Sequence, residues 1–192
     1  QKDALGTEME AQFMQRLTEE AAAIPLSEGL PVALDWINGR RTPDANQELK
    51  AAISNISLGT RAPHVFKALV HAICFGSKKI LRRFEDEGVP IDSIIGIGGV
   101  ARKSPYIMAN VLNRPIKVAS SDQAPALGAA IYAAVAAGCY PDVISAGRKM
   151  GSRFEAEYVP DPEQVGLLEP FEASYDALAA FVEQLGSKKV LL

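Results

Sequence analysis

The sequence predicts an α/β protein in which helices flank a mainly parallel sheet. Strand-length apolar runs alternate with helix-length segments over residues 91–137, which is typical of right-handed crossover units. The apolar run IDSIIGI ends in Gly98 and Gly99, directly before a helical pattern. A composition of 48% hydrophobic and 22% charged residues is that of a globular protein with a substantial core.

The first part of the chain predicts a helix followed by an antiparallel hairpin. A capping-box pattern near the N-terminus predicts a first helix that ends before Pro25. Residues 31–37 form a strand-like run, and Asn38-Gly39 after it is a strong signal for a tight hairpin turn. Residues 56–58 are predicted as a second short strand.

A long helix is predicted over residues 62–87, with Gly88 as the residue that ends it. Its apolar stripe is expected at residues 65, 69, 72, 76 and 80. The basic run of this helix, Lys78, Lys79, Arg82 and Arg83, is interpreted as a solvated face.

The second half of the chain alternates between the two kinds of element. We predict strand 91–97, helix 105–112, strand 115–119 and helix 124–137. The first of these strands is expected to be buried on both faces, as in other parallel sheets. Residues 141–168 have weak periodicity and several prolines, which indicates a peripheral insertion before a terminal amphipathic helix.

Charge and residue content exclude several classes of function. A net charge of −3 gives no basic surface for nucleic acid, and the apolar runs are too short for a membrane span. Cys74 and Cys139 form no disulfide framework and are predicted as buried thiols in a reducing cytoplasm. His64 and His71 are too few for a metal site. Because the sequence opens on Gln1 without a secretory signal, we expect a processed or trimmed chain or a fragment.

Two glycine-marked junctions are candidate ligand contacts. In open α/β sheets ligands bind beyond the carboxyl ends of the strands, where Gly98 and Gly99 would let a flat ligand lie against the main chain. Gly128, in the first turns of the next helix, would allow a similarly close approach. The alternatives are a tight strand-to-helix turn and ordinary packing of the helix on the sheet.

Three stretches together resemble the FGGY family of carbohydrate kinases. They are GIGGVARKSP, NRPIKVASSDQ and ALGAAIYAAVAAG, in that order and at the family's spacing. The resemblance implies a ribonuclease-H-like, actin-type ATPase fold: a mixed sheet with flanking helices. It assigns residues 1–192 to the C-terminal, nucleotide-side domain. The family's N-terminal domain, which carries a phosphate loop and the catalytic aspartate, is absent from this sequence.

The resemblance also implies roles for particular residues. It implies that Gly98, Gly99, Ser104 and Gly128 contact the adenosine. Gly59 and Thr60 would form a turn that faces the cleft between the two domains of the family, and Glu28 and Asp35 would contact the sugar. Neither a catalytic residue nor a metal ligand is expected in this chain. For Gly59 the alternative is a helix-start turn, for Glu28 a solvated carboxylate, and for Trp36 a place in the core or a domain interface.

The stretch GLPVALDWINGRRTPDANQEL narrows the resemblance to the branch that phosphorylates L-ribulose with ATP and Mg²⁺. Expected partners are L-ribulose or a related sugar, the N-terminal domain and a second copy in a homodimer, with neither nucleic acid nor membrane. Another pentulose, a polyol or glycerol is the alternative acceptor, and a non-catalytic actin-type nucleotide-binding domain is the alternative class. One departure is His71, where the family commonly has a glutamate.

Overall fold

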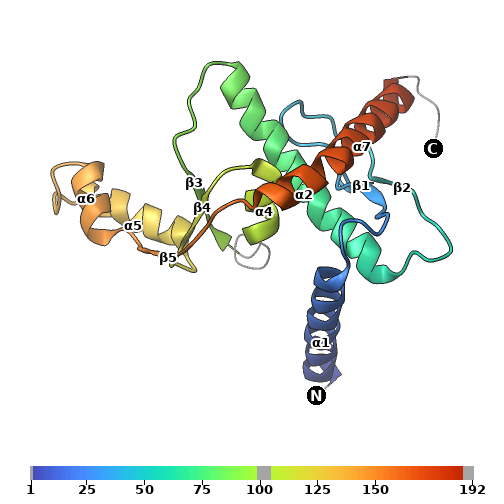
Figure 1. Ribbon diagram of the computed structural model, residues 1–192. Coiled ribbons are helices and arrows are strands. Elements are labelled where there is room, and N and C mark those ends of the chain that lie inside the picture. Colours follow the sequence, from blue (N-terminus) through green and yellow to red (C-terminus); the bar gives the residue numbers. More distant parts are fainter. Residues whose placement is uncertain (1, 99–104, 188–192) are drawn as a thin grey trace. The chain divides into compact units, whose positions relative to one another are not determined.

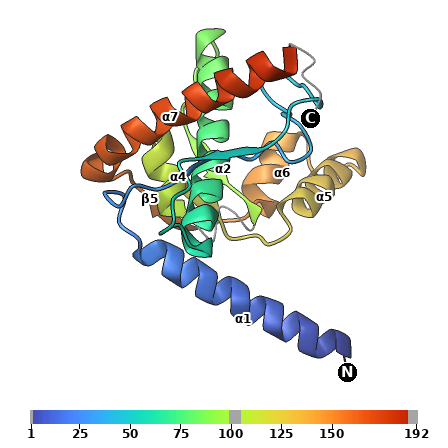
Figure 2. The same cartoon turned by 90° about the vertical axis from the view of Figure 1, so that its right-hand side faces the viewer.

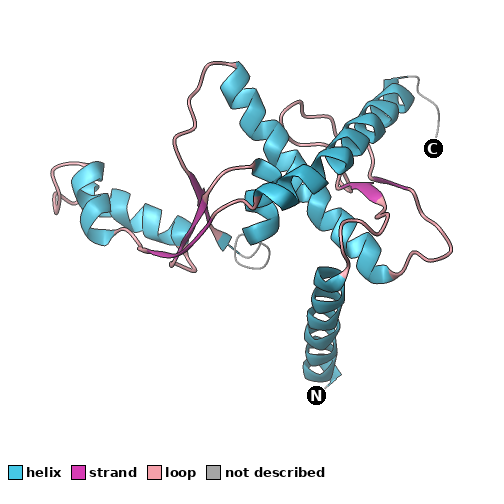
Figure 3. Ribbon diagram, viewed as in Figure 1, coloured by secondary structure: helices cyan, strands magenta, loops and turns pink. Residues whose placement is uncertain are grey.

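The computed structural model of the protein describes residues 2–98 and 105–187. The chain divides into two compact units, Gln1–Val89 with Glu163–Leu192 (unit 1) and Pro90–Pro162 (unit 2). Helices dominate both units, and the strands are short (Figure 3).

Unit 1 consists of three long helices and a two-stranded antiparallel sheet (Figure 1). Its elements are α1 (Lys2–Ala23), β1 (Val32–Leu34), β2 (Ala52–Ser54), α2 (Ala62–Asp86) and α7 (Pro162–Ser187). Strands β1 and β2 pair with Ala33 opposite Ile53. The chain from the end of β1 to the start of β2 is a long loop rather than a tight hairpin, so the predicted two-residue turn is wrong. Asn38 and Gly39 instead make a turn inside this loop, where the Gly39 N–H donates to the Trp36 carbonyl.

The core of unit 1 lies where α2 packs against β1 and α7. All three residues of β1 are buried, and Leu34 is completely inaccessible, which contributes about 2 kcal/mol of hydrophobic free energy. On α2, Phe75 packs against Tyr175 of α7 with ring centroids 5.5 Å apart. Figure 2 shows α7 crossing α2. The predicted bounds of α2 are confirmed to within one residue.

The buried face of α2 lies beside the predicted apolar stripe. Its buried residues are Pro63, His64, Lys67, Ala68, His71, Ala72, Cys74 and Phe75, whereas positions 65, 69, 76 and 80 are half-buried. The face shifted because α2 is covered from two sides, by α1 and β1 and by α7. Burying Lys67 and His71 required partners: the Lys67 ammonium donates to the carbonyl of Ile24, and His71 contacts the ring of Phe171.

The basic run of α2 is a solvated face only in part, because Arg82 and Arg83 are exposed whereas the two lysines lie against α7. Lys78 contacts Glu172 of α7 at 2.7 Å, Arg82 contacts the other oxygen of the same carboxylate at 2.7 Å, and Lys79 contacts Asp176 at 2.6 Å. Glu172 is buried, so these cations compensate a carboxylate that has lost its water. Glu172 and Asp176, one turn apart on α7, therefore hold α7 against α2 through ion pairs; these contacts are called the clamp below.

Unit 2 is built around a three-stranded mixed sheet. Its elements are β3 (Ile94–Gly96), α4 (Pro105–Leu112), β4 (Ile116–Ala119), α5 (Ala124–Ala136), α6 (Val143–Met150) and β5 (Phe154–Tyr158). The strand order is β3-β4-β5, with β3 parallel and β5 antiparallel to β4. Ala109 and Leu112 of α4 pack on Ile116 of β4 to form the core.

Several local predictions for unit 2 need correction. Residues 141–168 are no peripheral insertion, because they contain α6, the sheet strand β5 and the start of α7. Strand β3 is not buried on both faces, since Ile95 is 52% exposed. Cys139 is exposed, whereas Cys74 is buried as predicted. In unit 1, the predicted strand at 56–58 is an exposed turn, and the strand lies earlier, at β2.

Candidate functional site

The glycine-marked junctions of unit 2 lie at one edge of its sheet. Strands β3 and β4 run parallel with Gly96 opposite Val118, so Gly98 and the start of α5 both follow the carboxyl edge. Gly98 has φ +76°, and a Cβ built there would meet none of the described atoms within 4 Å. The backbone conformation therefore accounts for glycine at this position. The predicted contacts Gly99 and Ser104 lie outside the described residues.

Gly128 lies in the second turn of α5, and a Cβ built there would also meet no atom within 4 Å. Packing of α5 on another element therefore does not explain this glycine within the part of the chain that the structure describes. At the N-terminus of α5 the Gln123 side chain makes no capping hydrogen bond. Uncapped N–H groups at a helix start favour an anion such as phosphate. The edge thus combines an open glycine surface with an anion-compatible helix end.

In unit 1, Gly59 and Thr60 form the turn that leads into α2. The Thr60 N–H donates to the Ser57 carbonyl, and its hydroxyl accepts from the Ser57 N–H at 2.9 Å. Gly59 is exposed and has ordinary space around it, so the helix-start turn accounts for the local geometry of this pair.

Glu28 lies beside the first turn of α2. One of its carboxylate oxygens is 3.7 Å from His64 Nε2, while His64 Nδ1 accepts the Arg61 N–H at 3.2 Å. This hydrogen bond leaves the imidazole proton on Nε2, facing Glu28. The Glu28 side chain is 56% exposed, which fits either a solvated carboxylate or one that faces a ligand.

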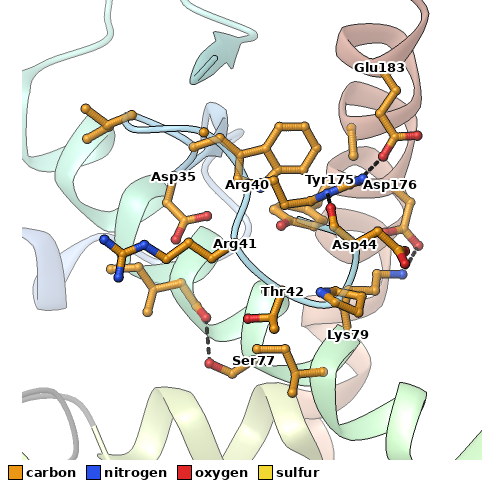
Figure 4. Close-up of a pocket in the computed structure, with 18 of the residues that line it drawn as sticks. Asp35, Arg40, Arg41, Thr42, Asp44, Ser77, Lys79, Tyr175, Asp176 and Glu183 are labelled. Atoms are coloured by element: carbon orange, nitrogen blue, oxygen red, sulfur yellow. Dashed lines mark hydrogen bonds and ion pairs between the residues drawn. The ribbon is translucent and has the colours of Figure 1, made fainter. Parts of the chain in front are cut away.

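Asp35 lies elsewhere in unit 1, where it lines a cavity (Figure 4). The cavity has a volume of about 580 Å³, within the range typical of small-molecule sites, and is lined by the loop 35–44, by α2 and by α7. Asp35 is half-buried, and burial raises the pKa of its carboxyl group. The same burial, with Asp35 nearby, raises the pKa of the Tyr175 hydroxyl to about 12.

Ion pairs hold the loop of this cavity in place. Arg40 stacks over the ring of Trp36, 5.2 Å from its centroid, and pairs with Glu183 of α7. The Arg40 Nε donates to the Asp44 carbonyl at 2.7 Å. Because the Arg40 guanidinium reaches the loop, the indole and α7 at once, it fixes the loop against the helix. Trp36 itself is 6% exposed, as expected for a core residue rather than a sugar platform.

The two predicted sugar contacts are not brought together. Glu28 faces His64, whereas Asp35 lies next to Gly76, where a Cβ would be 4.0 Å from its Oδ1. Twelve residues of α2 separate these two positions, which is about 18 Å along a helix.

Comparison with known proteins assigns the family. Residues 2–137 match the FGGY family of carbohydrate kinases, C-terminal domain. The chain belongs to this family. All of the predicted site residues fall inside the matched stretch, whereas α7, which closes the cavity, lies beyond it.

Individual members of the FGGY family are clearly related to this chain. It is 43% identical over 181 residues to a protein named Ribulokinase from Vibrio parahaemolyticus, covering 93% of this chain and 32% of that protein. A Ribulokinase from Bacillus licheniformis is 36% identical over 172 residues, covering 86% of this chain and 31% of that protein. The chain therefore spans about a third of the length of these relatives.

Solved structures confirm the predicted fold class. The xylulose kinase from Rhodospirillum rubrum superposes with a TM-score of 0.76 at 23% identity, covering 91% of this chain and 35% of that one. A kinase from Brucella ovis gives a TM-score of 0.78 at 20% identity, covering 95% and 38%. This FGGY chain thus has the actin-like ATPase architecture of the sugar kinases, as its motifs predict.

Sequence reasoning missed the residues that close the cavity: Arg40, Lys79, Tyr175, Asp176 and Glu183. The available signal was the spacing of acids on the terminal helix, opposite the basic run of α2. The described residues contain neither a cluster of three metal-ligating side chains nor a helix long and apolar enough to span a membrane. Mg²⁺ does not require such a cluster, because one or two carboxylates and the nucleotide phosphates usually hold it.

Proposed function

We propose that this chain is the C-terminal, nucleotide-side part of an ATP-dependent kinase that converts L-ribulose to L-ribulose 5-phosphate. The observation that carries the proposal is the 43% identity to a Ribulokinase across 93% of the chain. Relatives acting on xylulose, gluconate or glycerol are below 25% identity, so they give no support to another acceptor.

In this proposal the adenosine lies on the open edge of unit 2, against Gly98, Gly99, Ser104 and Gly128. The exposed backbone at Gly98 and the uncapped start of α5 fit a flat base and a phosphate. Gly59 and Thr60, at the start of α2, would face the cleft between this domain and the N-terminal domain. Bound Mg²⁺ would neutralise charge on the transferring phosphoryl group.

Glu28 and Asp35 are the two candidate sugar contacts of this chain. Because about 18 Å of α2 separates them, one pentulose would contact only one of the two, and Asp35, the half-buried one, is the proposed contact. A half-buried carboxylate that accepts hydrogen bonds from hydroxyls discriminates strongly, because a substrate without those hydroxyls leaves it unpaired. The general base and a phosphate loop would come from an N-terminal partner domain, since the relatives are about three times as long as this chain. A homodimer and a cytoplasmic location remain predictions.

Calorimetry with ATP and Mg²⁺ tests the nucleotide site on the chain itself. We expect weak but saturable binding that Gly128→Leu abolishes. For turnover, the chain replaces the matching third of the Vibrio parahaemolyticus Ribulokinase, and a coupled assay measures phosphorylation of L-ribulose. The chain alone is expected to phosphorylate nothing, because catalytic parts that act as a unit are not additive. A chimera that binds ATP but prefers D-xylulose or glycerol would contradict the proposed acceptor.

A further inference from the structure

Arg40 fastens the loop 35–44 to α7. Its guanidinium pairs with Glu183 of α7, its Nε donates to the Asp44 carbonyl at 2.7 Å, and its Cζ lies 5.2 Å from the centroid of the Trp36 ring (Figure 4). The Arg40 side chain is 19% exposed, so solvent screens its charge only weakly. A planar guanidinium can stack and donate at the same time, which the ammonium group of a lysine cannot do.

The main chain of Arg40 is held as well as its side chain. The Arg40 N–H donates to the Asn46 carbonyl, and the Asn46 N–H donates to the Arg40 carbonyl, each at 2.9 Å. One residue earlier, the Gly39 N–H donates to the Trp36 carbonyl at 3.0 Å. Because the loop holds its backbone and α7 holds its side chain, Arg40 couples the position of the loop to that of the helix.

Asp35, directly before Trp36, is the polar group that this coupling affects. Among the described residues, no side chain of another residue forms a hydrogen bond or an ion pair with its carboxylate. Its direction therefore depends on its backbone and on the packing of its neighbours. The nearest of these is Trp36, which is 6% exposed and lies against the Arg40 guanidinium.

We propose that Arg40 and Glu183 are positioning residues, which hold the loop so that Asp35 is oriented toward the sugar. The inference rests on the proposed function, in which Asp35 contacts the pentulose. It gives α7 a part in substrate recognition, although α7 lies beyond residues 2–137 that match the family. Without the ion pair, the loop has to be ordered when the sugar binds, which weakens binding and leaves the transfer step unchanged.

Steady-state kinetics of the chimera with the Vibrio parahaemolyticus Ribulokinase tests this role. Glu183→Gln keeps the size of the side chain and removes the charge that Arg40 contacts. We expect the KM for L-ribulose to rise by roughly three- to tenfold, the cost of ordering one or two side chains on binding, with kcat and the KM for ATP unchanged. Arg40→Lys should raise the same KM, because lysine restores the charge but neither the stacking nor the simultaneous hydrogen bond.

Glu172→Gln is the matched control. Glu172 also lies on α7 and also pairs with cations, but these are Lys78 and Arg82 of α2 and not residues of the loop. It should lower stability more than Glu183→Gln does, because the Glu183 carboxylate is 44% exposed. The KM for L-ribulose should nevertheless stay unchanged at temperatures where the chimera remains folded. A merely stabilising role of the Arg40–Glu183 pair predicts the opposite order of the two KM effects.

Fluorescence of Trp36 provides a second measurement, which needs no activity. Trp36 is the only tryptophan in the sequence, so the emission of the chain alone reports on the loop. In Glu183→Gln and Arg40→Lys we expect emission at longer wavelength and stronger quenching by acrylamide, because the indole gains contact with water. Glu172→Gln should keep the spectrum of the parent chain.

Three results would overturn the proposal while leaving the proposed function intact. They are an unchanged KM for L-ribulose in both Glu183→Gln and Arg40→Lys, an equal rise of this KM in Glu172→Gln, and a Trp36 spectrum that neither loop variant alters. A parent chimera that binds ATP but does not phosphorylate L-ribulose would instead overturn the proposed function, and this inference with it.

Discussion

Helix α2 of unit 1 and helix α5 of unit 2 differ sharply in how they are covered. Eight residues of α2 are buried, including two histidines and a lysine. Helix α5, with the sequence APALGAAIYAAVA, contains no charged residue, yet none of its residues is buried and Tyr132 is 66% exposed. Apolar character therefore did not decide burial. What decided it is how many sides of the helix are covered: α2 packs against α1, β1 and α7, whereas α5 packs against α6.

The difference extends to the sites. Unit 1 encloses its candidate site, because ion pairs hold a loop and two helices around a cavity. Unit 2 leaves its site open, since no described atom would lie within 4 Å of a Cβ at Gly98 or Gly128. Substitutions in the enclosed core of unit 1 should accordingly lower its stability, whereas substitutions at the open edge of unit 2 should mainly weaken ligand binding. Four predictions test this contrast, in order of decreasing effect.

Gly39→Ala should have the largest effect on stability. Gly39 has φ +84°, and a Cβ there would lie 2.4 Å from the Gln47 Cα, which is backbone and cannot rotate away. We expect destabilisation of about 4 kcal/mol, from the left-handed conformation and the clash together. Urea denaturation measures it. Gly88→Ala is the matched control, since φ is +79° in open space and only about 1 kcal/mol is expected. Equal losses of unfolding free energy in the two variants would contradict the close contact between Gly39 and the Gln47 backbone.

Acidification should destabilise unit 1 through His71. Burial, with a smaller effect of Lys67, lowers the pKa of His71 from 6.5 to about 4. Between these values the unfolded chain binds the proton and the folded chain does not. Stability is therefore complete above pH 6.5 and falls as the pH drops toward 4, by roughly 3 kcal/mol in total. His71→Leu should remove this part of the pH dependence. Identical slopes of unfolding free energy against pH in both proteins would argue against a neutral buried imidazole.

Glu172→Gln should loosen the clamp between α2 and α7. It removes the charge that Lys78 and Arg82 both contact at 2.7 Å, at a position where the carboxylate side chain is only 12% exposed. A loss of about 2 kcal/mol is expected, below the value for a fully buried pair because Arg82 is partly solvated. Asp44→Asn is the control, because its 3.8 Å contact with Arg83 is exposed and should contribute less than about 0.5 kcal/mol. If both variants lowered the thermal unfolding temperature to a similar extent, the buried ion pairs of Glu172 would contribute no more stability than an exposed pair.

Gly128→Ala should be the mildest change and the most informative for unit 2. With no atom within 4 Å of the new methyl group, alanine should stabilise α5 by up to about 1 kcal/mol. Nucleotide affinity should nevertheless fall if the adenosine lies on this helix. Circular dichroism and calorimetry on one sample separate the two effects. A variant that loses stability would show that α5 packs against something at this position.

The sequence by itself determined the family, the elements around the glycine junctions and the open character of Gly98. Helices α2, α4 and α5 and strand β4 lie within about a residue of their predicted bounds, because strong periodicity, proline and glycine mark their ends. Gly98 was identifiable because a glycine at the end of an apolar strand usually reflects a backbone requirement.

Only the tertiary structure decided which side chains meet across the chain. Residues 143–158 carry too weak a pattern to predict, and strand β5 forms because β4 offers it an unpaired edge. Asp35 and Arg41 share a cavity only because α7, more than 120 residues further along, closes it. A local sequence pattern depends only on residues that are close together along the chain. The ion pairs of Arg40 with Glu183 and of Lys78 with Glu172 join segments that no local pattern connects.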